Sequence, residues 1–582
     1  MARAFINRPE DFVLESIEGA VASIPHLWRL DGFPQVKVVF SSKADESKVA
    51  VISGGGSGHE PAHAGYVGTG MLTAAVAGDV FASPPTEAVL AAIRTACSDA
   101  GALVVVTNYT GDRLNFGLAV EQAMTEGHKV EMLVVGDDCA LSPSRLVGRR
   151  GIAGTVFVHK VAGASAAAGD DLATVLAKAR ATAQSVGSMG VATSVCTVPG
   201  SKPADPPRIQ PGEMELGLGI HGEPGASKGP LKPVDQIVAQ MLQTIMSRET
   251  RYIDVQRGAR VALLVNSLGS VMPNELHIAA WAAIKELQDT FKVEVARVYV
   301  GTFMTSLDMS GFSLSVCTLD DERTAALDAD TEAPAWPRCQ GAHLPSKRPV
   351  PLPHHRADKQ HTQRPTRLSA LGARMERALA ALCGALIDAA PELDALDAKV
   401  GDGDCGSTLR RGAEAMQADL AHRLPLNDAA ATLKGLARTL RVMGGTSGVL
   451  YVISLTAAAG SLQECSSSAS EEGPSGQDWA RAFGVAIQAL QRYSQAEKGH
   501  RTMVDALIPA QEAFSEAVNA GQSALPALGA ACRAAAKGAA ATKGMEAGAG
   551  RSSYVPDHVL RDVPDPGAQA VCIWLKALAR AL

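Results

Sequence analysis

Residues 345–367 read PSKRPVPLPHHRADKQHTQRPTR, and the composition of the chain changes at this stretch. It holds five prolines, three histidines and six Lys or Arg residues against the single acidic Asp358. Because proline lacks a backbone donor and no hydrophobic period runs through the segment, we expect an exposed linker. A basic arm that binds nucleic acid is the weaker alternative, since aromatic residues are not interleaved with the charges. The stretch therefore predicts a different domain on each side.

The chain before this linker repeats short apolar runs rich in Val and Ile. These predicted strands are Val36–Phe40, Val49–Ile52, Leu103–Thr107, Val130–Val135, Thr155–His159, Val261–Val265 and Val293–Val300. Helix-like stretches such as Pro85–Ala96 separate several of them, an alternation that predicts an α/β architecture with substantial parallel sheet. A new set of strands follows the helical stretch Val234–Met246. We therefore expect a domain at 1–340 made of two α/β subdomains, about 1–190 and 191–340.

After the linker, the hydrophobic period becomes that of helices. Spacings of three and four, as on one face of a helix, relate two series of apolar residues. The series are Leu371, Met375, Leu379, Leu382 and Leu386, and then Leu433, Leu436, Leu440 and Met443. The chain ends on another apolar helix, AVCIWLKALARAL (570–582). With 341–367 as the linker, we expect an all-α domain over 368–582.

Composition and charge narrow the class of protein. A chain of 582 residues is too long for one core, and 46% hydrophobic with 20% charged residues is ordinary for a globular protein. The 54 basic and 60 acidic residues leave a net charge of −6, so nucleic acid is not an expected partner. Charges interrupt the apolar residues near the N-terminus, and no apolar run reaches about 18 residues, so we expect neither a signal peptide nor a membrane span. Ten cysteines without a CxxC pair suggest reduced thiols and a cytoplasmic location.

Two glycine-containing loops follow predicted strands. Residues 53–61 (SGGGSGHEP) come directly after Val49–Ile52, and residues 108–115 (NYTGDRLN) come after Leu103–Thr107. Ligands of open α/β sheets bind at the carboxyl ends of strands, and glycines let backbone N–H groups approach a ligand. Asp112 in the second loop suits either a general base or the N-cap of the next helix, and the local sequence favours the cap.

A third loop, residues 215–225 (ELGLGIHGEPG), places His221 between glycines. A lone histidine is more often structural than catalytic. However, Gly-His-Glu-Pro in the first loop and His-Gly-Glu-Pro here repeat one pattern. The repetition makes a functional role for both histidines a reasonable hypothesis.

Three carboxylates, Asp397, Asp402 and Asp404, fall within eight residues of a glycine-rich turn. Hard oxygen ligands at such a turn suit Mg²⁺, although a solvated acidic turn is the alternative and the EF-hand pattern is absent. Small and hydroxyl residues at Gly444–Gly448 and Gly548–Ser553 suit the binding of phosphates. Together these segments predict a nucleoside triphosphate site.

Taken in order, these motifs resemble the single-chain, ATP-dependent dihydroxyacetone (triose) kinases over nearly the whole chain. The resemblance rests on SGGGSGHEPAHAG, NYTGDRLNFG, GTVFVHKVAGA, VPGSKP, ELGLGIHGEPG, GTFMTSLDM, LDAKVGDGDCGST, MGGTSG, RTMVDAL and MEAGAGRSSYV. It implies phosphorylation of dihydroxyacetone, and of glyceraldehyde, by ATP with Mg²⁺. It further implies a C-terminal barrel of antiparallel helices and a cytoplasmic homodimer.

The resemblance also implies roles for single residues. His221 would bond the substrate carbonyl as a hemiaminal, with Asp112 and His59 as its acid–base companions. Gly56, Ser57, Gly58, His59 and Asp112 would bind the substrate. Asp397, Asp402 and Asp404 would hold Mg²⁺. The nucleotide-binding residues would be Asp402, Gly403, Asp404, Cys405, Gly445, Thr446, Ser447, His500, Arg501, Gly550 and Arg551.

One departure and three alternatives remain open. The family commonly has Gly-Asp-Arg-Thr-Met where this chain has His500 in place of the aspartate, which puts one nucleotide contact in doubt. Some relatives also split FAD into AMP and cyclic riboflavin phosphate, for which Mn²⁺ would be a cofactor. A kinase fed by phosphoenolpyruvate is less expected, since both domains share one chain. A non-catalytic carbonyl-binding relative is disfavoured by the intact His221, Asp112 and aspartate cluster.

Overall fold

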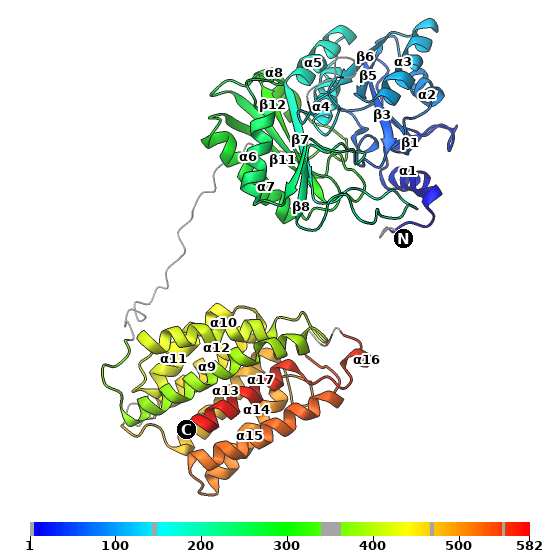
Figure 1. The fold of residues 1–582 in the computed structure, drawn as a ribbon. Coiled ribbons are helices and arrows are strands. Elements are labelled where there is room, and N and C mark those ends of the chain that lie inside the picture. Colours follow the sequence, from blue (N-terminus) through cyan, green and yellow to red (C-terminus); the bar gives the residue numbers. More distant parts are fainter. Residues whose placement is uncertain (1–4, 142–147, 339–362, 466–470, 550–552, 554) are drawn as a thin grey trace. The chain divides into compact units, whose positions relative to one another are not determined.

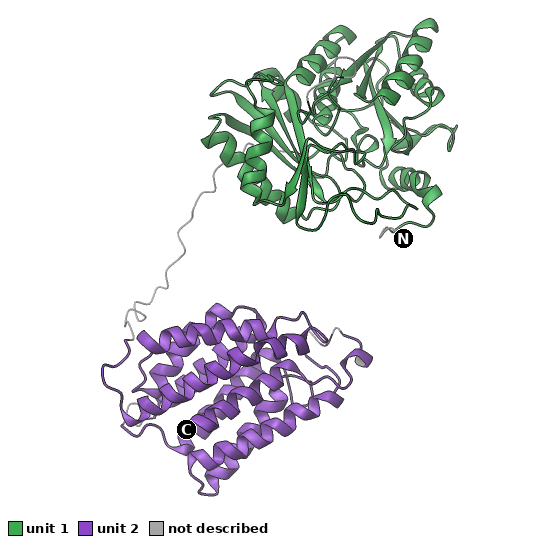
Figure 2. Cartoon of the chain, viewed as in Figure 1, with its two compact units in different colours: residues 1–348 green, residues 349–582 purple. Residues whose placement is uncertain are grey.

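The computed structural model describes residues 5–141, 148–338, 363–465, 471–549, 553 and 555–582. Figure 2 shows the chain as two compact units, residues 1–348 and 349–582. Most of the expected linker lies outside the described residues. The α/β character of the first unit and the all-α character of the second confirm the predicted fold classes.

The first unit begins with a sheet that is parallel over four of its strands (Figure 1). Its strands are β1 (Leu27–Arg29), β2 (Val38–Ser41), β3 (Ala50–Ser57), β4 (Ala74–Val80), β5 (Ala102–Thr107) and β6 (Val130–Val135), in the order β1-β2-β4-β3-β5-β6. Strands β4, β3, β5 and β6 run parallel, whereas β1 and β2 are antiparallel additions. The helices α2 (Thr86–Ala96) and α3 (Thr110–Thr125) pack against one face of the sheet. The carboxyl ends of β3 and β5 therefore lie side by side.

The second sheet of this unit is largely antiparallel, which differs from the expected parallel character. Its strands are β7 (Val186–Ala192), β8 (Glu213–Leu216), β9 (Ser227–Pro230), β10 (Arg260–Ser267), β11 (Glu294–Gly301) and β12 (Gly311–Leu319), in the order β11-β10-β12-β7-β8-β9. Only the β10–β11 pair is parallel. The helices α6 (Val234–Ile245) and α7 (Pro273–Asp289) cover one face. The chain passes from the first sheet to the second between β6, which ends at Val135, and β7, which begins at Val186.

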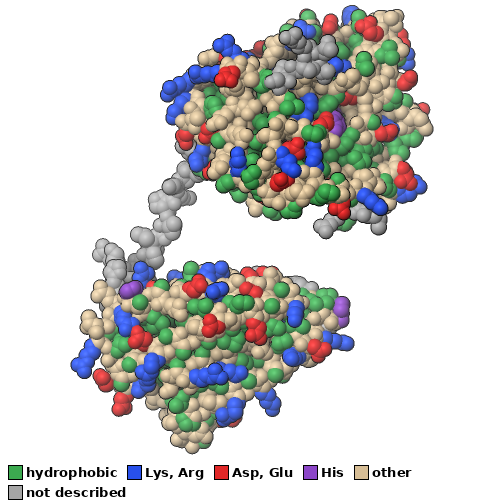
Figure 3. All heavy atoms as spheres, viewed as in Figure 1, with side chains coloured by type: hydrophobic (Ala, Val, Ile, Leu, Met, Phe, Trp, Pro, Cys, Tyr) green, Lys and Arg blue, Asp and Glu red, His purple; other side chains and the backbone are tan. Residues whose placement is uncertain are grey.

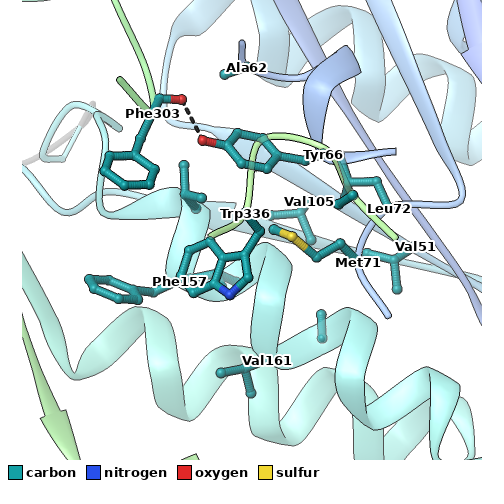
Figure 4. Packing of buried hydrophobic residues seen from close by; sticks show 14 of the residues in the cluster. Val51, Ala62, Tyr66, Met71, Leu72, Val105, Phe157, Val161, Phe303 and Trp336 are labelled. Atoms are coloured by element: carbon teal, nitrogen blue, oxygen red, sulfur yellow. Dashed lines mark hydrogen bonds between the residues drawn. The ribbon is translucent and has the colours of Figure 1, made fainter. Parts of the chain in front are cut away.

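The predicted strand Thr155–His159 is wrong: these residues form the first turns of helix α4 (Thr155–Ala167). Every residue from Thr155 to Ala166 is buried, because α4 lies in a core cluster that takes residues from both sheets. A helix that is apolar on all sides has no polar face, so a short piece of it resembles a buried strand. In Figure 4, Phe157 and Val161 of α4 contribute to this core beside Trp336. The helices α1 (Phe12–Ser23), α5 (Leu172–Gln184) and α8 (Asp321–Asp328) complete the unit.

The second unit consists of antiparallel helices. They are α9 (Ala370–Asp397), α10 (Cys405–His422), α11 (Ala429–Thr439), α12 (Gly445–Gln463), α13 (Gly476–Ser494), α14 (Val504–Asn519), α15 (Ala524–Ala541), α16 (Asp557–Leu560) and α17 (Pro566–Ala581). The longer helices enclose an apolar cavity of about 540 Å³. Leu379, Leu436, Tyr451, Phe483 and Trp574 are among its lining residues.

Among the described helices, α12 alone is long and apolar enough to cross a bilayer by length and composition. A core helix passes the same test, and Tyr451, Leu455 and Ala458 of α12 line the apolar cavity. Acidic and basic side chains are interspersed on the face of each unit that Figure 3 shows.

Candidate functional site

Strand β3 places the first glycine-rich loop at the carboxyl ends of the parallel strands of the first sheet. The strand extends to Ser57, so the glycines are part of it instead of following it, as the sequence suggested. A Cβ at Gly54 would lie 2.2 Å from the carbonyl oxygen of Val76 on β4, which only glycine avoids. Gly58 has a φ of +102°, and a Cβ there would contact the Phe81 ring. The backbone thus turns sharply before His59.

Two of the residues expected to bind substrate, Ser57 and Gly58, already form hydrogen bonds within the protein. The hydroxyl of Ser57 donates to the carbonyl of Gly78 at 2.8 Å. The amide of Gly58 donates to the carboxylate of Glu60 at 3.0 Å. Gly56 is closely packed against the backbone of residues 81–82. These residues shape the loop, and the side chain directed to the site is that of His59.

Four rings from four separate segments meet at this edge. The ring of His221 lies 4.9 Å from that of His59, 5.1 Å from Phe81 and 4.6 Å from Tyr109, each centroid to centroid and edge-to-face. His59 is stacked on Phe81 at 5.1 Å. The structure therefore brings together two histidines that lie far apart in the sequence and packs them against Phe81 and Tyr109.

His59 has one engaged and one available ring nitrogen. Its Nδ1 lies 2.9 Å from the carbonyl oxygen of Thr305, so this nitrogen carries the proton and donates it. Its Nε2 is buried and has no hydrogen-bond partner among the described residues. Burial lowers the pKa of His59 to about 3, and the neighbouring His221 contributes to the shift. The ring is therefore neutral, with an acceptor nitrogen at Nε2.

Asp112 does not cap helix α3, contrary to the sequence-based preference. The helix begins at Thr110 after Tyr109 as N-cap, so Asp112 lies within the first turn. Its carboxyl is 7% exposed, and its Oδ1 has no hydrogen-bond partner among the described residues. Burial raises its pKa, while Ser83 and His221 act in the opposite direction. A buried carboxylate of raised pKa is suited to accept a proton.

His221 is held by Glu223, two residues further on. The Nδ1 of His221 lies 3.0 Å from Oε1 of Glu223, and the amide of His221 donates to Oε2 of the same carboxylate at 3.0 Å. Burial raises the pKa of Glu223, but the ring and amide of His221 more than offset it, and the pKa falls to about 2. The ionised carboxylate therefore accepts from Nδ1, and Nε2 of His221 stays available.

Polar atoms without partners gather around His221. The buried atoms without a hydrogen-bond partner in the described chain include Nε2 of His59 and Oη of Tyr109, whose rings pack against His221, and Oδ1 of Asp112, whose carboxyl interacts electrostatically with His221. Buried polar groups are normally hydrogen-bonded, so such a group of orphans indicates a missing polar ligand. The site suits a small molecule with hydroxyl and carbonyl groups.

The aspartate cluster of the second unit forms at the α9–α10 turn. Ligand oxygens of Asp397, Asp402 and Asp404 lie within 4.8 Å of one another. Oδ2 of Asp397 also accepts from the amides of Asp404 and Cys405 at 3.0 and 3.1 Å. Gly403 has a φ of +79°, which lets the turn bring the carboxylates together. Three convergent carboxylates fit a divalent cation such as Mg²⁺.

The other expected nucleotide segments differ in exposure. Gly444, with a φ of +66°, is the N-cap of helix α12, Gly445, with a φ of +60°, is its first residue, and Thr446 is exposed beside them. Arg501, in contrast, is 0% exposed. Its Nη2 donates to the carbonyl of Val563 at 2.9 Å, while Nε and Nη1 have no partner among the described residues. Gly550 and Arg551 lie outside the described residues.

The departure at His500 has a local structural account. Its Nδ1 accepts from the amide of Glu497 at 3.2 Å, a role that a carboxylate at this position would also serve. Asp505 closes the same loop by accepting from the amides of Gly499 and Thr502 at 2.5 and 2.8 Å. The loop therefore keeps its internal hydrogen bonds without the aspartate.

Sequence reasoning missed several residues of the site. Glu223 was part of the repeated motif but received no role, although its i+2 spacing from His221 was a usable signal. Tyr109 and Thr305 lie in the motifs NYTGDRLNFG and GTFMTSLDM but received no role. Phe81 lies outside the quoted motifs and reaches the site only through the tertiary fold.

Known families and proteins match this chain along its whole length. The Dak1 domain matches residues 18–335, and the DAK2 domain matches residues 399–580. A Solanum lycopersicum protein, provisionally named a 3,4-dihydroxy-2-butanone kinase, is 51% identical over 100% of this chain and 98% of its own. The triokinase/FMN cyclase of Rattus norvegicus is 42% identical over 100% of this chain and 99% of its own. The crystal structure of the dihydroxyacetone kinase from C. freundii in complex with AMP-PNP and Mg²⁺ has a TM-score of 0.68 and 37% identity, covering 100% of both chains.

Proposed function

Because this chain belongs to the dihydroxyacetone kinase family, we propose that it transfers the γ-phosphoryl group of ATP to a terminal hydroxyl of dihydroxyacetone, and also to glyceraldehyde. The observation that carries the proposal is the cluster of side chains around His221. There the available Nε2 of His221, the buried carboxylate of Asp112 and the neutral ring of His59 lie together beside aromatic rings. Each of these groups has a use in the reaction.

The ketone is held as a hemiaminal on His221. Nε2 attacks the carbonyl carbon, so an N–C bond forms and the C=O π pair moves to oxygen. That oxygen takes one proton from water, and the imidazole gives up its Nδ1 proton, which Glu223 is placed to accept. Dihydroxyacetone offers few atoms for binding, and a reversible covalent bond compensates for its size. Glycerol has no carbonyl and cannot form it.

Asp112 acts as general base. Its ionised carboxylate accepts the proton of the terminal hydroxyl as that oxygen attacks phosphorus. His59, neutral and with Nε2 unpartnered, accepts a hydrogen bond from a substrate hydroxyl and orients it. The chemistry depends on positioning more than on covalent help, as is usual for phosphoryl transfer.

Asp397, Asp402 and Asp404 would hold Mg²⁺, which when bound neutralises charge on the triphosphate. Gly445, Thr446 and Ser447 would bind phosphates at the N-terminus of α12. Arg501 would contribute to nucleotide binding through Nε and Nη1, which are buried and have no partner among the described residues. We also propose that the protein works as a cytoplasmic homodimer in glycerol metabolism, in keeping with the family resemblance.

The test is an ADP-release assay of the full chain with dihydroxyacetone, glyceraldehyde and glycerol, with and without Mg²⁺. We expect turnover with the two carbonyl compounds, no turnover with glycerol, and loss of all turnover when Mg²⁺ is chelated. ADP release that does not depend on the carbonyl substrate would contradict the proposal.

A second candidate activity is the cleavage of FAD to AMP and cyclic riboflavin phosphate. The full-length likeness to the rat triokinase/FMN cyclase favours it. Incubation with FAD and Mn²⁺, followed by chromatography of the flavin product, tests it. Unchanged FAD would limit the protein to the kinase reaction.

A further inference from the structure

We infer that Glu223 is a positioning residue that fixes His221 in the tautomer protonated at Nδ1. We further infer that the ion pair of the buried Asp138 with Arg150 holds the loop that carries both residues. The inference rests on the proposed function, because its purpose is to present an unprotonated Nε2 to the substrate carbonyl. It adds Glu223, Asp138 and Arg150 to the residues on which the reaction depends.

The first step is the grip of Glu223 on His221. One carboxylate accepts from the ring Nδ1 and from the backbone amide of the same residue, both at 3.0 Å. The amide of Gly222, whose φ is +78°, donates to the carbonyl of Gly219 at 3.1 Å and closes the turn between them. The two contacts fix the ring orientation as well as the proton position.

The second step is the space that the carboxylate occupies. A Cβ at Gly219 would lie 1.9 Å from Oε2 of Glu223 and 2.8 Å from Nη1 of Arg150. Glu223 and Arg150 therefore converge on the point where a side chain at 219 would stand. Only glycine at this position lets the carboxylate lie against the loop backbone.

The third step is the support of Arg150. Its Nη2 lies 2.6 Å from Oδ2 of Asp138, and Nε donates to the same oxygen at 2.8 Å. Its Nη2 also donates to the carbonyl of Gly217 at 2.7 Å. Asp138 is 3% exposed, so the pair ties the His221 loop to a buried anchor beyond strand β6.

The contact with Glu223 determines which nitrogen of His221 can attack the substrate carbonyl. A carboxylate at Nδ1 keeps the proton there and raises the electron density of Nε2. As the N–C bond forms, the same carboxylate stabilises the cationic ring or accepts its proton. A ring released from Glu223 would also populate the tautomer protonated at Nε2, in which Nε2 has no free lone pair with which to attack the carbonyl.

The direct test is ¹⁵N NMR of the full chain labelled at histidine, with the signals of residue 221 identified by their loss in His221→Ala. We expect a neutral ring protonated at Nδ1 in the free wild-type protein. A ring protonated at Nε2 would overturn the inference, and this measurement needs no variant at position 223.

The second test follows adduct formation with dihydroxyacetone carrying ¹³C at its carbonyl carbon, without ATP. Glu223→Met has similar volume but no acceptor, and it should lose the tetrahedral-carbon signal and at least about a hundredfold in kcat/KM. Glu223→Gln keeps one acceptor oxygen and should recover part of both. The matched control is Glu213→Gln on β8, whose carboxylate pairs with Lys228 and lies outside the site.

The outcomes separate the inference from the proposed function. Wild-type protein that neither forms the adduct nor phosphorylates dihydroxyacetone would end the proposed function. Active wild-type protein whose Glu223→Met variant forms the adduct to the same extent would end only the inference. If Glu223→Met does not fold, the tautomer of His221 in the wild-type protein still decides whether the inference holds.

Discussion

The Nδ1 atom of His59 lies 2.9 Å from the carbonyl oxygen of Thr305, and this contact joins the two sheets of the first unit. His59 follows strand β3, whereas Thr305 lies between β11 and β12. Because the donor nitrogen is engaged away from His221, the nitrogen left for a ligand is an acceptor. We therefore propose that His59 accepts a hydrogen bond from a substrate hydroxyl and does not supply a proton.

Replacement of His59 by Phe should preserve stacking on Phe81 and remove the acceptor. We expect kcat/KM for dihydroxyacetone to fall by about tenfold to a hundredfold, the cost of one buried hydrogen bond. Steady-state kinetics and a thermal melt check this. Unchanged KM and kcat in a folded His59→Phe protein would show that Nε2 does not contact the substrate.

Activity should fall on the acid side as Asp112 takes up a proton. Burial raises the pKa of this carboxyl, so the base form is lost at a higher pH than for an ordinary aspartate. His59, whose pKa is lowered to about 3, stays neutral above about pH 3 and should not affect the acid limb of the pH–activity profile. The pH dependence of kcat/KM for wild type and His59→Phe should therefore share one acid limb. Asp112→Asn should lose at least about a hundredfold in kcat.

His221→Ala should lose turnover of ketones by at least about a hundredfold, because the substrate is no longer held by a bond. It should also lose the preference for dihydroxyacetone over glycerol. Competition assays with both compounds measure the preference. A variant that still excludes glycerol would indicate that pocket shape, not the hemiaminal, selects the substrate.

Asp402→Asn and Asp404→Asn should abolish turnover and leave the fold intact. Both carboxylates are exposed, so their removal takes charge from the cation site without disturbing the core. Asp388→Asn, an exposed carboxylate on the same helix α9, is the control that should retain activity. Activity and thermal melts are compared across the three variants. Full activity in both cluster variants would remove the cation site from the proposal.

Gly54→Ala should destabilise the first unit by about 1–3 kcal/mol, because the new methyl group meets the Val76 carbonyl. Gly19→Ala is the matched control. It lies in helix α1 with nothing within 4 Å of its Cβ position, and it should stabilise by about 0.5–1 kcal/mol. Denaturant unfolding measures both. Equal stability of the two variants would contradict the close approach of β3 and β4.

The fold was predictable where local pattern and burial agree. Val130–Val135 has the same bounds as predicted strand and as β6, and the apolar spacing of Leu371–Leu386 lies within helix α9. Strand β7 was missed because its sequence, VGSMGVA, places two glycines in a short run. Such a strand is stabilised by its neighbours and carries no local signal of its own.

The candidate site was predictable as a set of motifs but not as a geometry. Glycine patterns marked the loops of His59, Asp112 and His221, and the structure places them together. The predicted cap role of Asp112 was wrong because the helix starts at Thr110, two residues before Asp112. Thr305 lies in a quoted motif, but its contact with His59, like the contact of Arg150 with the His221 loop, joins distant segments and is revealed only by packing.

The burial of helix α4 bears on how the first unit unfolds. Its core cluster includes Val51 and Val105 from the first sheet and Leu264 and Cys317 from the second. Loss of either sheet would therefore expose the same apolar side chains to water. We expect the two sheets to melt as one cooperative transition, with coincident loss of secondary and tertiary signals. Fragments cut between β6 and β7 should not fold separately, even though each would retain a sheet of six strands.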